Sequence, residues 1–268
     1  MGNKFYYTKT GTLVDWQLAR SIEFDFWDVV LQGLDLPYRF IVTENTESLP
    51  ICGEDVVVIL KSDEFYSPVI YLDRVKAVFR NYYDKKYHDS KNCYFLPLPF
   101  LGLKLDVRQP PINQRKIDIF FAGQVKHSSR RQFIDAVNEL RFSNKYLHTE
   151  VIQNDNFFSG LNLPDYYAKL GNSKIALCPY GASIETYRHF EALQSGCICI
   201  TQPVPDAWYF QNAPYVTLNN WNELSTKVNE IFSKPGDLAD ASLQGISFWK
   251  RTLSPQSVIR YIHSKLSL

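Results

Sequence analysis

Arg188 and Glu191 form the pair of side chains in this sequence with the clearest capacity for chemistry. They are three residues apart in a stretch with helical propensity, so both lie on one face of a helix. A guanidinium can bind a diphosphate through two parallel hydrogen bonds, and a carboxylate can accept hydrogen bonds from the hydroxyls of a ribose. A nucleotide-sugar site needs both groups, but spacing alone favours a surface ion pair on an amphipathic helix.

The elements around this pair would place it at a ligand-binding edge. An apolar strand over 175–178 is stopped by Pro179, Gly181 permits a tight loop, and helical propensity resumes near Glu185. Loops at the carboxyl ends of parallel strands are where α/β proteins bind ligands. The helix that follows offers free N–H groups and a positive dipole end to a phosphate.

Strand-like and helix-like stretches alternate along the whole chain, which predicts an α/β fold with parallel sheets. The expected strands are 39–43, 55–60, 77–82, 93–96, 116–124, 175–178 and 197–201. The expected helices are 14–34, 128–140, the segment between the last two strands, 222–232 and 254–268.

A segment without periodicity, containing Pro110-Pro111, divides the chain and reads as an extended linker. We expect an N-terminal acceptor-binding domain at 1–104, a linker at 105–115 and a nucleotide-binding domain at 116–252. The helix at 253–268 would pack back on the first domain. Two such halves predict a cleft between them.

The composition excludes several classes of protein. With 268 residues, 45% of them hydrophobic, the chain can bury a core. The formal net charge of +1 gives no basic surplus for a nucleic-acid partner. The five cysteines form no CxxC pair and no zinc-ligand spacing, which favours free thiols in a reducing compartment.

Nothing in the sequence reads as a secretory signal, an N-glycosylation sequon or an apolar run of the ~20 residues that span a bilayer. We therefore expect a soluble cytoplasmic chain with no transmembrane segment. A membrane anchor outside the given sequence stays open.

Residues 178–193 closely resemble the donor-site motif of exostosin-like glycosyltransferases, in which a Cys-Pro-x-Gly loop precedes a Thr-x-Arg-x-x-Glu-Ala-Leu helix. The strand that follows in the family is similar to 196–200, with Cys199 in place of the family's proline. Segments 60–64, 78–83, 94–99 and 120–123 resemble other parts of the family more faintly. The resemblance implies the GT-B fold, in which two Rossmann-like domains face a central cleft.

Carried over residue by residue, the resemblance assigns Arg188 to the phosphates and Glu191 to the ribose. The remaining residues implied for the donor pocket are Gly123, Arg130, Arg131, Tyr180, Gly181, Ser183 and Thr186. His127 would touch phosphate or sugar, and His189 would pack.

An inverting transferase needs a general base to take the proton of the acceptor hydroxyl, and in GT-B enzymes this base comes from the N-terminal domain. Asp63 and Glu64, after a buried strand, fit that place best, followed by Asp73 and then Glu44. For Asp63 a turn-capping role is an equal alternative. Arg80 would orient these carboxylates, contact phosphate or form a structural ion pair.

The spacing of Glu185 and Glu191 lacks the E-x7-E signature of many retaining families, and the sequence has no Asp-x-Asp triad. We therefore expect an inverting enzyme with no essential metal and no cofactor. It would move a sugar from a UDP-sugar, with UDP-xylose as first choice, to a hydroxyl of a glycan or oligosaccharide acceptor. A retaining GT-B enzyme and a non-catalytic nucleotide- or glycan-binding subunit remain as alternatives.

Overall fold

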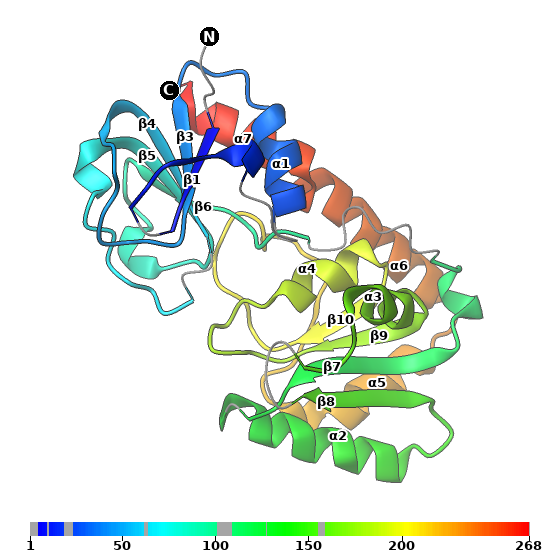
Figure 1. Cartoon of the computed structure of the whole chain (residues 1–268). Helices are drawn as coiled ribbons and strands as arrows, with labels where there is room; N and C mark the ends of the chain where they lie inside the picture. The colour runs from blue at the N-terminus through cyan, green and yellow to red at the C-terminus, as the bar shows by residue number, and fades with distance from the viewer. Residues whose placement is uncertain are drawn as a thin grey trace. The chain divides into compact units, whose positions relative to one another are not determined.

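The computed structural model describes residues 5–9, 11–18, 24–61, 64–100, 109–126, 128–154 and 159–267. The chain forms two compact units, each with its own sheet (Figure 1). The first unit contains 1–101, 206–209 and 252–268, and the second contains 102–205 and 210–251. The short segment Asp206–Tyr209, expected in the second domain, therefore lies in the first unit.

The sheet of the first unit has the strand order β2-β1-β3-β4-β5-β6. Its strands are β1 (Phe5–Thr8), β2 (Val14–Asp15), β3 (Arg39–Thr43), β4 (Gly53–Leu60), β5 (Val75–Arg80) and β6 (Cys93–Phe95). All neighbours pair in parallel except β1 and β2. The apolar run 56–60 of β4 is fully buried, as expected for a central parallel strand covered on both faces.

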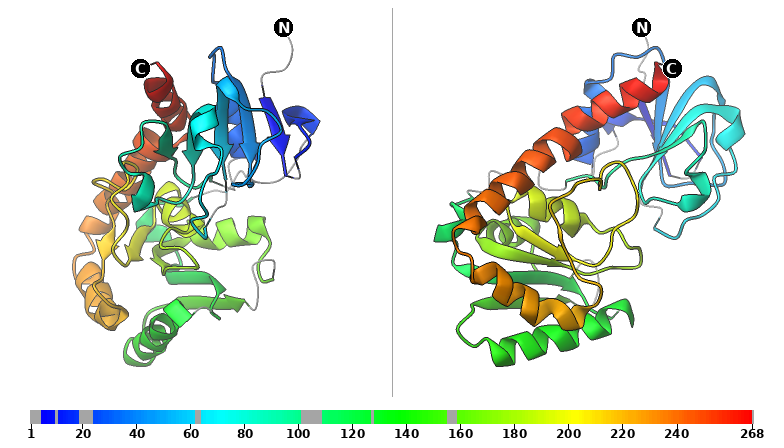
Figure 2. Two further views of the ribbon diagram at one scale, coloured as in Figure 1. Left: turned by 90° about the vertical axis from the view of Figure 1, so that its left-hand side faces the viewer. Right: turned by 180° about the vertical axis from the view of Figure 1, so that it is seen from behind.

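Two helices of the first unit, α1 (Phe24–Gln32) and α7 (Pro255–Leu266), pack against each other. Figures 1 and 2 show them side by side. Contact is close where Gly33 ends α1, because a Cβ there would lie 2.4 Å from Cδ1 of Ile259. Ser254 caps α7 by accepting a hydrogen bond from the N–H of Ser257. The C-terminal helix is thus part of the first unit.

The prediction of one helix over 14–34 was wrong in its first part. Val14 and Asp15 pair antiparallel with β1, and a 3₁₀ turn, η1 (Trp16–Leu18), follows. The indole of Trp16 donates a hydrogen bond of 3.1 Å to Asp28, which ties this turn to α1. Tertiary contacts therefore override the helical spacing of the apolar residues here.

The second unit contains a five-stranded, fully parallel sheet in the order β11-β10-β9-β7-β8. Its strands are β7 (Ile117–Gln124), β8 (Thr149–Asn154), β9 (Ser173–Cys178), β10 (Ile198–Thr201) and β11 (Val216–Thr217). Its helices are α2 (Arg131–Ser143), α3 (Leu163–Gly171), α4 (Tyr187–Gln194), α5 (Leu224–Phe232) and α6 (Asp237–Phe248).

Helices cover both faces of this sheet, as the alternation of side chains along β7 shows. Phe121 packs on Phe133 of α2, with the ring centroids 4.7 Å apart, in a core that also contains Trp221 and residues of α5. Phe120 points to the other face, where its ring lies 5.9 Å from that of Tyr166 on α3. Helix α4 also packs against β9 and β10 (Figure 1).

The strand order places a topological switch point between β7 and β9. From β7 the chain moves outward to β8 and then returns to β9 on the other side of β7. The connections that leave β7 and β9 at their carboxyl ends therefore diverge. Such a point leaves a crevice at the carboxyl edge of the sheet, where open α/β sheets bind ligands.

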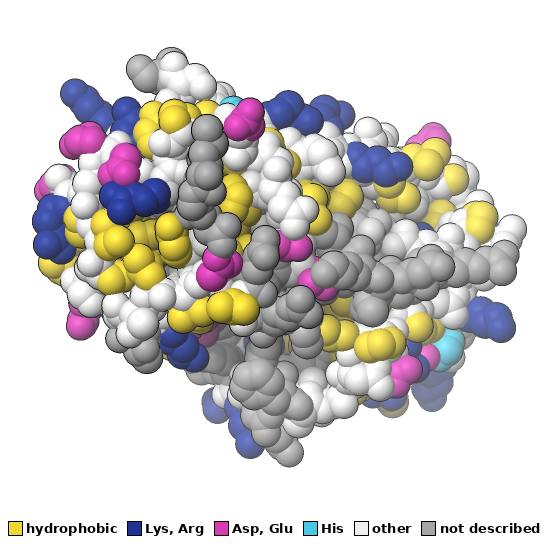
Figure 3. Space-filling model, turned by 45° about the horizontal axis from the view of Figure 1, so that its top comes forward, with side chains coloured by type: hydrophobic (Ala, Val, Ile, Leu, Met, Phe, Trp, Pro, Cys, Tyr) yellow, Lys and Arg dark blue, Asp and Glu magenta, His cyan; other side chains and the backbone are white. Residues whose placement is uncertain are grey.

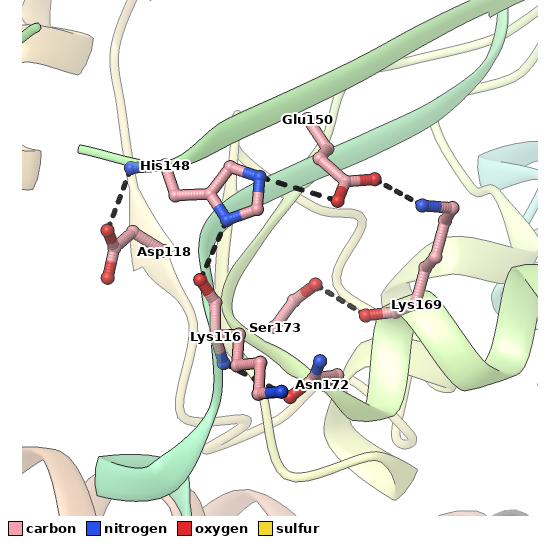
Figure 4. A network of polar contacts seen from close by, with 7 residues as sticks. All are labelled: Lys116, Asp118, His148, Glu150, Lys169, Asn172 and Ser173. Carbon is pink, nitrogen blue, oxygen red and sulfur yellow. Dashed lines mark hydrogen bonds and ion pairs between the residues drawn. The ribbon is translucent and has the colours of Figure 1, made fainter.

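The opposite, amino edge of this sheet is closed by matched charges (Figure 4). Lys169 lies 2.6 Å from Glu150, and Lys174 lies 2.7 Å from Asp118. The N–H of His148 donates to Asp118 at 2.9 Å. These partly exposed pairs contribute at most about 1 kcal/mol each and mainly fix the strand ends.

Charges of both signs are interspersed on the face of the molecule drawn in Figure 3, in keeping with the net charge of +1. Within the described residues, no helix combines the length and apolarity required to cross a membrane.

Candidate functional site

The loop after β9 carries the first polar groups at the switch point. The N–H of Gly181 donates to the carbonyl of Ser183 at 2.8 Å, which closes a tight turn. The carbonyl of Tyr180 accepts a hydrogen bond of 2.6 Å from Nε of Arg130, and the Tyr180 hydroxyl donates to the carbonyl of Pro203. The loop is thus held from both sides before α4 begins.

Thr186 has an extended backbone and is the N-cap residue directly before α4. The N–H of Thr186 donates to Nδ1 of His189 at 3.2 Å. Because Nδ1 accepts, the proton of the neutral imidazole is on Nε2, which lies 2.7 Å from the hydroxyl of Thr201. That hydroxyl in turn donates to the carbonyl of Cys178 at 3.0 Å. His189 therefore fastens the start of α4 to the sheet.

His189 should make the chain sensitive to acid. It is fully buried, and burial lowers its pKa from 6.5 to about 4. Between pH 4 and pH 6.5 the unfolded state therefore binds more protons than the folded state. The contribution of neutral His189 to the free energy of unfolding is complete above about pH 6.5 and is lost as the pH falls toward 4. The loss is roughly 3 kcal/mol.

Urea unfolding at pH 7 and pH 5 checks this expectation. His189→Gln cannot titrate and serves as the reference, so the difference between the two chains isolates the imidazole. An equal pH dependence in both chains would show that His189 does not titrate on unfolding.

Arg188, two positions into α4, points back over β7. Its guanidinium lies 4.7 Å above the ring of Phe121, and Nη2 donates to the carbonyl of Ala122. Its Nε atom is buried and, among the described residues, has no hydrogen-bond partner. A Cβ at Gly123 would lie 2.7 Å from Nη2, so only glycine leaves room for this approach.

Arg130 brings a second guanidinium to the same place. It is buried, donates to the carbonyls of Tyr180 and Gln124, and lies 5.9 Å from the ring of Phe121. Burial lowers its pKa to about 9, and the positive charge of Arg188 adds to this effect. Both causes show that the cation is short of compensating negative charge.

Within the described part of the chain, no carboxylate lies within ion-pair distance of Arg130 or Arg188. Lys169 and Lys174 at the amino edge of the same sheet are, by contrast, each paired with a carboxylate. Two partly desolvated like charges beside an open loop are unfavourable unless an anion joins them. The arrangement is therefore suited to a diphosphate.

Glu191 lies one turn further along α4 and is only 4% exposed. Its two oxygens accept hydrogen bonds of 2.7 Å from the Tyr166 hydroxyl and 2.6 Å from the Tyr167 hydroxyl. Burial raises the pKa of Glu191, whereas the two tyrosines and the charge of Arg188 oppose that rise. Sequence reasoning missed both tyrosines, because nothing in their spacing links them to Glu191.

The structure brings together most of the residues that the sequence assigned to the donor pocket. Gly123, Arg130, Tyr180, Gly181 and Arg188 are joined by the contacts given above. Ser183, also predicted, is buried in the loop, where its hydroxyl accepts from the N–H of Glu185 at 3.3 Å. Arg131 is exposed at the start of α2 and makes none of these contacts.

The candidates for the general base lie in the first unit. Asp63, like His127 of the second unit, falls outside the described residues. Glu64 is half-buried, four residues beyond the carboxyl end of β4. Asp73 is exposed in the 3₁₀ turn η2 (Leu72–Arg74), directly before β5. Because β4 and β5 are parallel, Asp73 lies toward the amino edge, away from the end of β4.

Two further polar residues of the first unit have structural partners. Glu44 forms an ion pair of 2.7 Å with Lys61. Arg80 is fully buried, with its guanidinium 3.9 Å from Asp84 and 5.2 Å from the ring centroid of Tyr87. Of the roles considered for Arg80, these contacts match the structural ion pair.

Among the residues that the structure describes, no group of three or more His, Cys, Asp or Glu side chains could hold a metal ion. The buried thiols of Cys178 and Cys199 lie 3.2 Å apart beneath α4 and are free.

Comparison with known proteins gives a family match over part of the chain and a fold. Residues 106–207 match the family model of the RXYLT1 C-terminal domain. No sequence among the curated proteins matches the chain.

Three solved structures illustrate the structural likeness. The pneumococcal O-GlcNAc transferase GtfA, in complex with UDP and GlcNAc, is 11% identical with a TM-score of 0.53, and the match covers 91% of this chain and 59% of GtfA. An alpha-glucosyltransferase in complex with UDP and DNA is 9% identical with a TM-score of 0.54, covering 92% and 84%. Anabaena Alr3699/HepE in complex with UDP is 12% identical with a TM-score of 0.55, covering 90% and 81%.

At these identities the likeness establishes the fold, which is that of GT-B glycosyltransferases, as predicted. The chain spans less than two thirds of GtfA and 55% of the S. aureus protein TarM.

Proposed function

We propose that this chain, whose residues 106–207 match the RXYLT1 C-terminal domain, is an exostosin-like glycosyltransferase that uses a UDP-sugar donor. The observation that carries the proposal is the pair Arg130 and Arg188. Both guanidiniums lie at the topological switch point of the second unit's sheet, and neither has a carboxylate partner among the described residues. A donor diphosphate supplies the missing negative charge.

The two arginines would have different tasks. Arg188 is half-buried and its buried Nε–H has no partner among the described residues, so we assign it to the phosphate next to the sugar. Arg130 is held by two backbone carbonyls and acts as a fixed positive charge behind the loop. When the sugar leaves, negative charge grows on that phosphate, and preorganised cations stabilise it most in this partly dry place. No metal is required in this account.

The reaction follows from this placement. The acceptor hydroxyl attacks the anomeric carbon, the bond to the diphosphate breaks, UDP leaves, and a base takes the hydroxyl proton. We propose inversion, since both oxygens of Glu191 are bonded to tyrosines and the spacing of Glu185 and Glu191 lacks the E-x7-E signature of many retaining families. UDP-xylose is the first donor to test, because the family model is that of RXYLT1, and a glycan hydroxyl is the proposed acceptor.

The base is proposed to be Glu64, four residues beyond the carboxyl end of β4, or Asp63, which lies outside the described residues. Glu64 follows the carboxyl edge of the first sheet, whereas Asp73 lies toward the other edge. A carboxylate at the carboxyl edge is the arrangement expected of ligand-facing residues in parallel sheets.

A transfer assay tests the proposal. The full chain is incubated with UDP-xylose, UDP-GlcNAc or UDP-glucuronate and a panel of oligosaccharides, with and without chelator. We expect acceptor-dependent UDP release that the chelator does not reduce. Loss of about 100-fold or more should follow from Asp63→Asn or Glu64→Gln, and little change from Asp73→Asn.

Three other outcomes would each reject one part of the proposed function: the base, the stereochemistry or the transfer activity. If both substitutions after β4 leave transfer intact, the base assignment is wrong. A product with the donor's anomeric configuration, read by NMR, identifies a retaining enzyme. UDP binding without transfer to any acceptor identifies a binding subunit.

A further inference from the structure

Helix α3 presents two adjacent tyrosines to one carboxylate. Tyr166 and Tyr167 donate to the separate oxygens of Glu191 at 2.7 and 2.6 Å. We propose that this tyrosine pair positions Glu191, holding it ionised and oriented for the ribose of the donor. The inference rests on the proposed function, since it assumes a nucleotide at the site.

The geometry of the pair is constrained on every side. Successive residues of a helix point about 100° apart, so both hydroxyls reach one carboxylate only if it lies between them. The two rings meet edge to face, with centroids 5.1 Å apart. Tyr167 is 3% exposed, and Tyr166 rests on the fully buried Phe120. These ring contacts help to hold both hydroxyls toward Glu191.

The charge state of Glu191 depends on these bonds. A carboxylate buried to this degree favours its protonated form, and burial raises its pKa accordingly. No described cation forms an ion pair with it. The tyrosine hydroxyls are therefore the main groups that hold the charged form, with Arg188 as a weaker contributor.

The same bonds leave the carboxylate able to bind a diol. Each carboxylate oxygen has about two acceptor positions, and one tyrosine takes one position on each oxygen. One position per oxygen remains, which matches the two hydroxyls of a ribose. If Glu191 were protonated, one of these positions would become a donor and the match would be lost. A purely structural role of the tyrosines, joining α3 to α4, would not involve the ribose.

The test combines Tyr167→Phe and Tyr166→Phe with two ligands. Calorimetry of the full chain measures the affinity for UDP and for 2′,3′-dideoxy-UDP between pH 6 and pH 8. We expect about tenfold weaker UDP binding for each variant. Dideoxy-UDP binding should stay within about twofold of the wild-type chain. The UDP deficit should widen as the pH falls, because the pKa of Glu191 rises further without a hydroxyl donor.

Tyr146→Phe, which removes an exposed hydroxyl of the same unit, is the matched control and should change neither affinity. Equal losses for both ligands would make the tyrosines structural only and overturn the inference, as would unchanged UDP binding. If Tyr167→Phe does not fold, the half-buried Tyr166→Phe decides the question alone. Failure of the wild-type chain to bind either ligand would instead reject the donor site itself.

Discussion

Arg188→Met should weaken UDP binding by about 100-fold or more without lowering the stability of the chain. Hydrogen bonds to charged groups contribute about 1.5–3 kcal/mol each, so losing a guanidinium that bonds to the diphosphate has an effect of this size. Methionine keeps an apolar contact with Phe121. It also removes the charge that repels Arg130, so the thermal midpoint without ligand should stay equal or rise.

Calorimetry with UDP and thermal unfolding without ligand measure the two effects separately. Arg141→Met, which removes an exposed arginine from the last turn of α2, is the control and should change neither. If Arg188→Met bound UDP like the wild-type chain, Arg188 would not be a phosphate ligand. A large fall in the thermal midpoint of Arg188→Met would show instead that Arg188 serves to stabilise the fold.

Gly123→Ala should reproduce much of this loss through a single methyl group. The added Cβ would lie 2.7 Å from Nη2 of Arg188, closer than real contacts allow. Because Nη2 is the end of a flexible side chain, the guanidinium moves and the backbone of β7 stays. We expect at least tenfold weaker UDP binding, consistent with a misplaced ligand group, and a thermal midpoint within a few degrees of wild type.

Gly236→Ala gives the matched control, since a Cβ there meets no atom within 4 Å. It should leave both the affinity and the midpoint unchanged. The double variant of Gly123→Ala with Arg188→Met should bind no worse than Arg188→Met alone. Additive losses would show that the glycine acts on the site by another route than the arginine.

The sequence predicted the central strands well because they are continuous apolar runs. Strands such as β3 and β4 are buried on both faces, so hydrophobicity alone marks them. Edge strand β8 was missed, because none of its residues is fully buried and its polar sequence lacks a pattern. The helix α3 was missed for a similar reason, since it is short and begins with Asn162-Leu163-Pro164 in a loop-like stretch.

The parts of the candidate donor site that are marked by residues next to each other in the sequence could be predicted. Pro179 and Gly181 mark the loop, and Thr186 opens α4, so the place of Arg188 could be expected. The bonds from Tyr166 and Tyr167 to Glu191 could not, because they depend on how α3 packs against α4. Asp73 was ranked as a base because sequence reasoning could not tell which edge of the sheet it lies on.

A ligand series tests most directly whether the carboxyl edge of the second sheet binds a diphosphate. Calorimetry compares UDP, UMP and uridine on the full chain at low and physiological salt. We predict that UDP binds at least 100-fold more tightly than uridine, with UMP between them and the difference reduced by Arg188→Met. Equal affinities for UDP and uridine, or a preference for UDP that Arg188→Met leaves intact, would contradict the account.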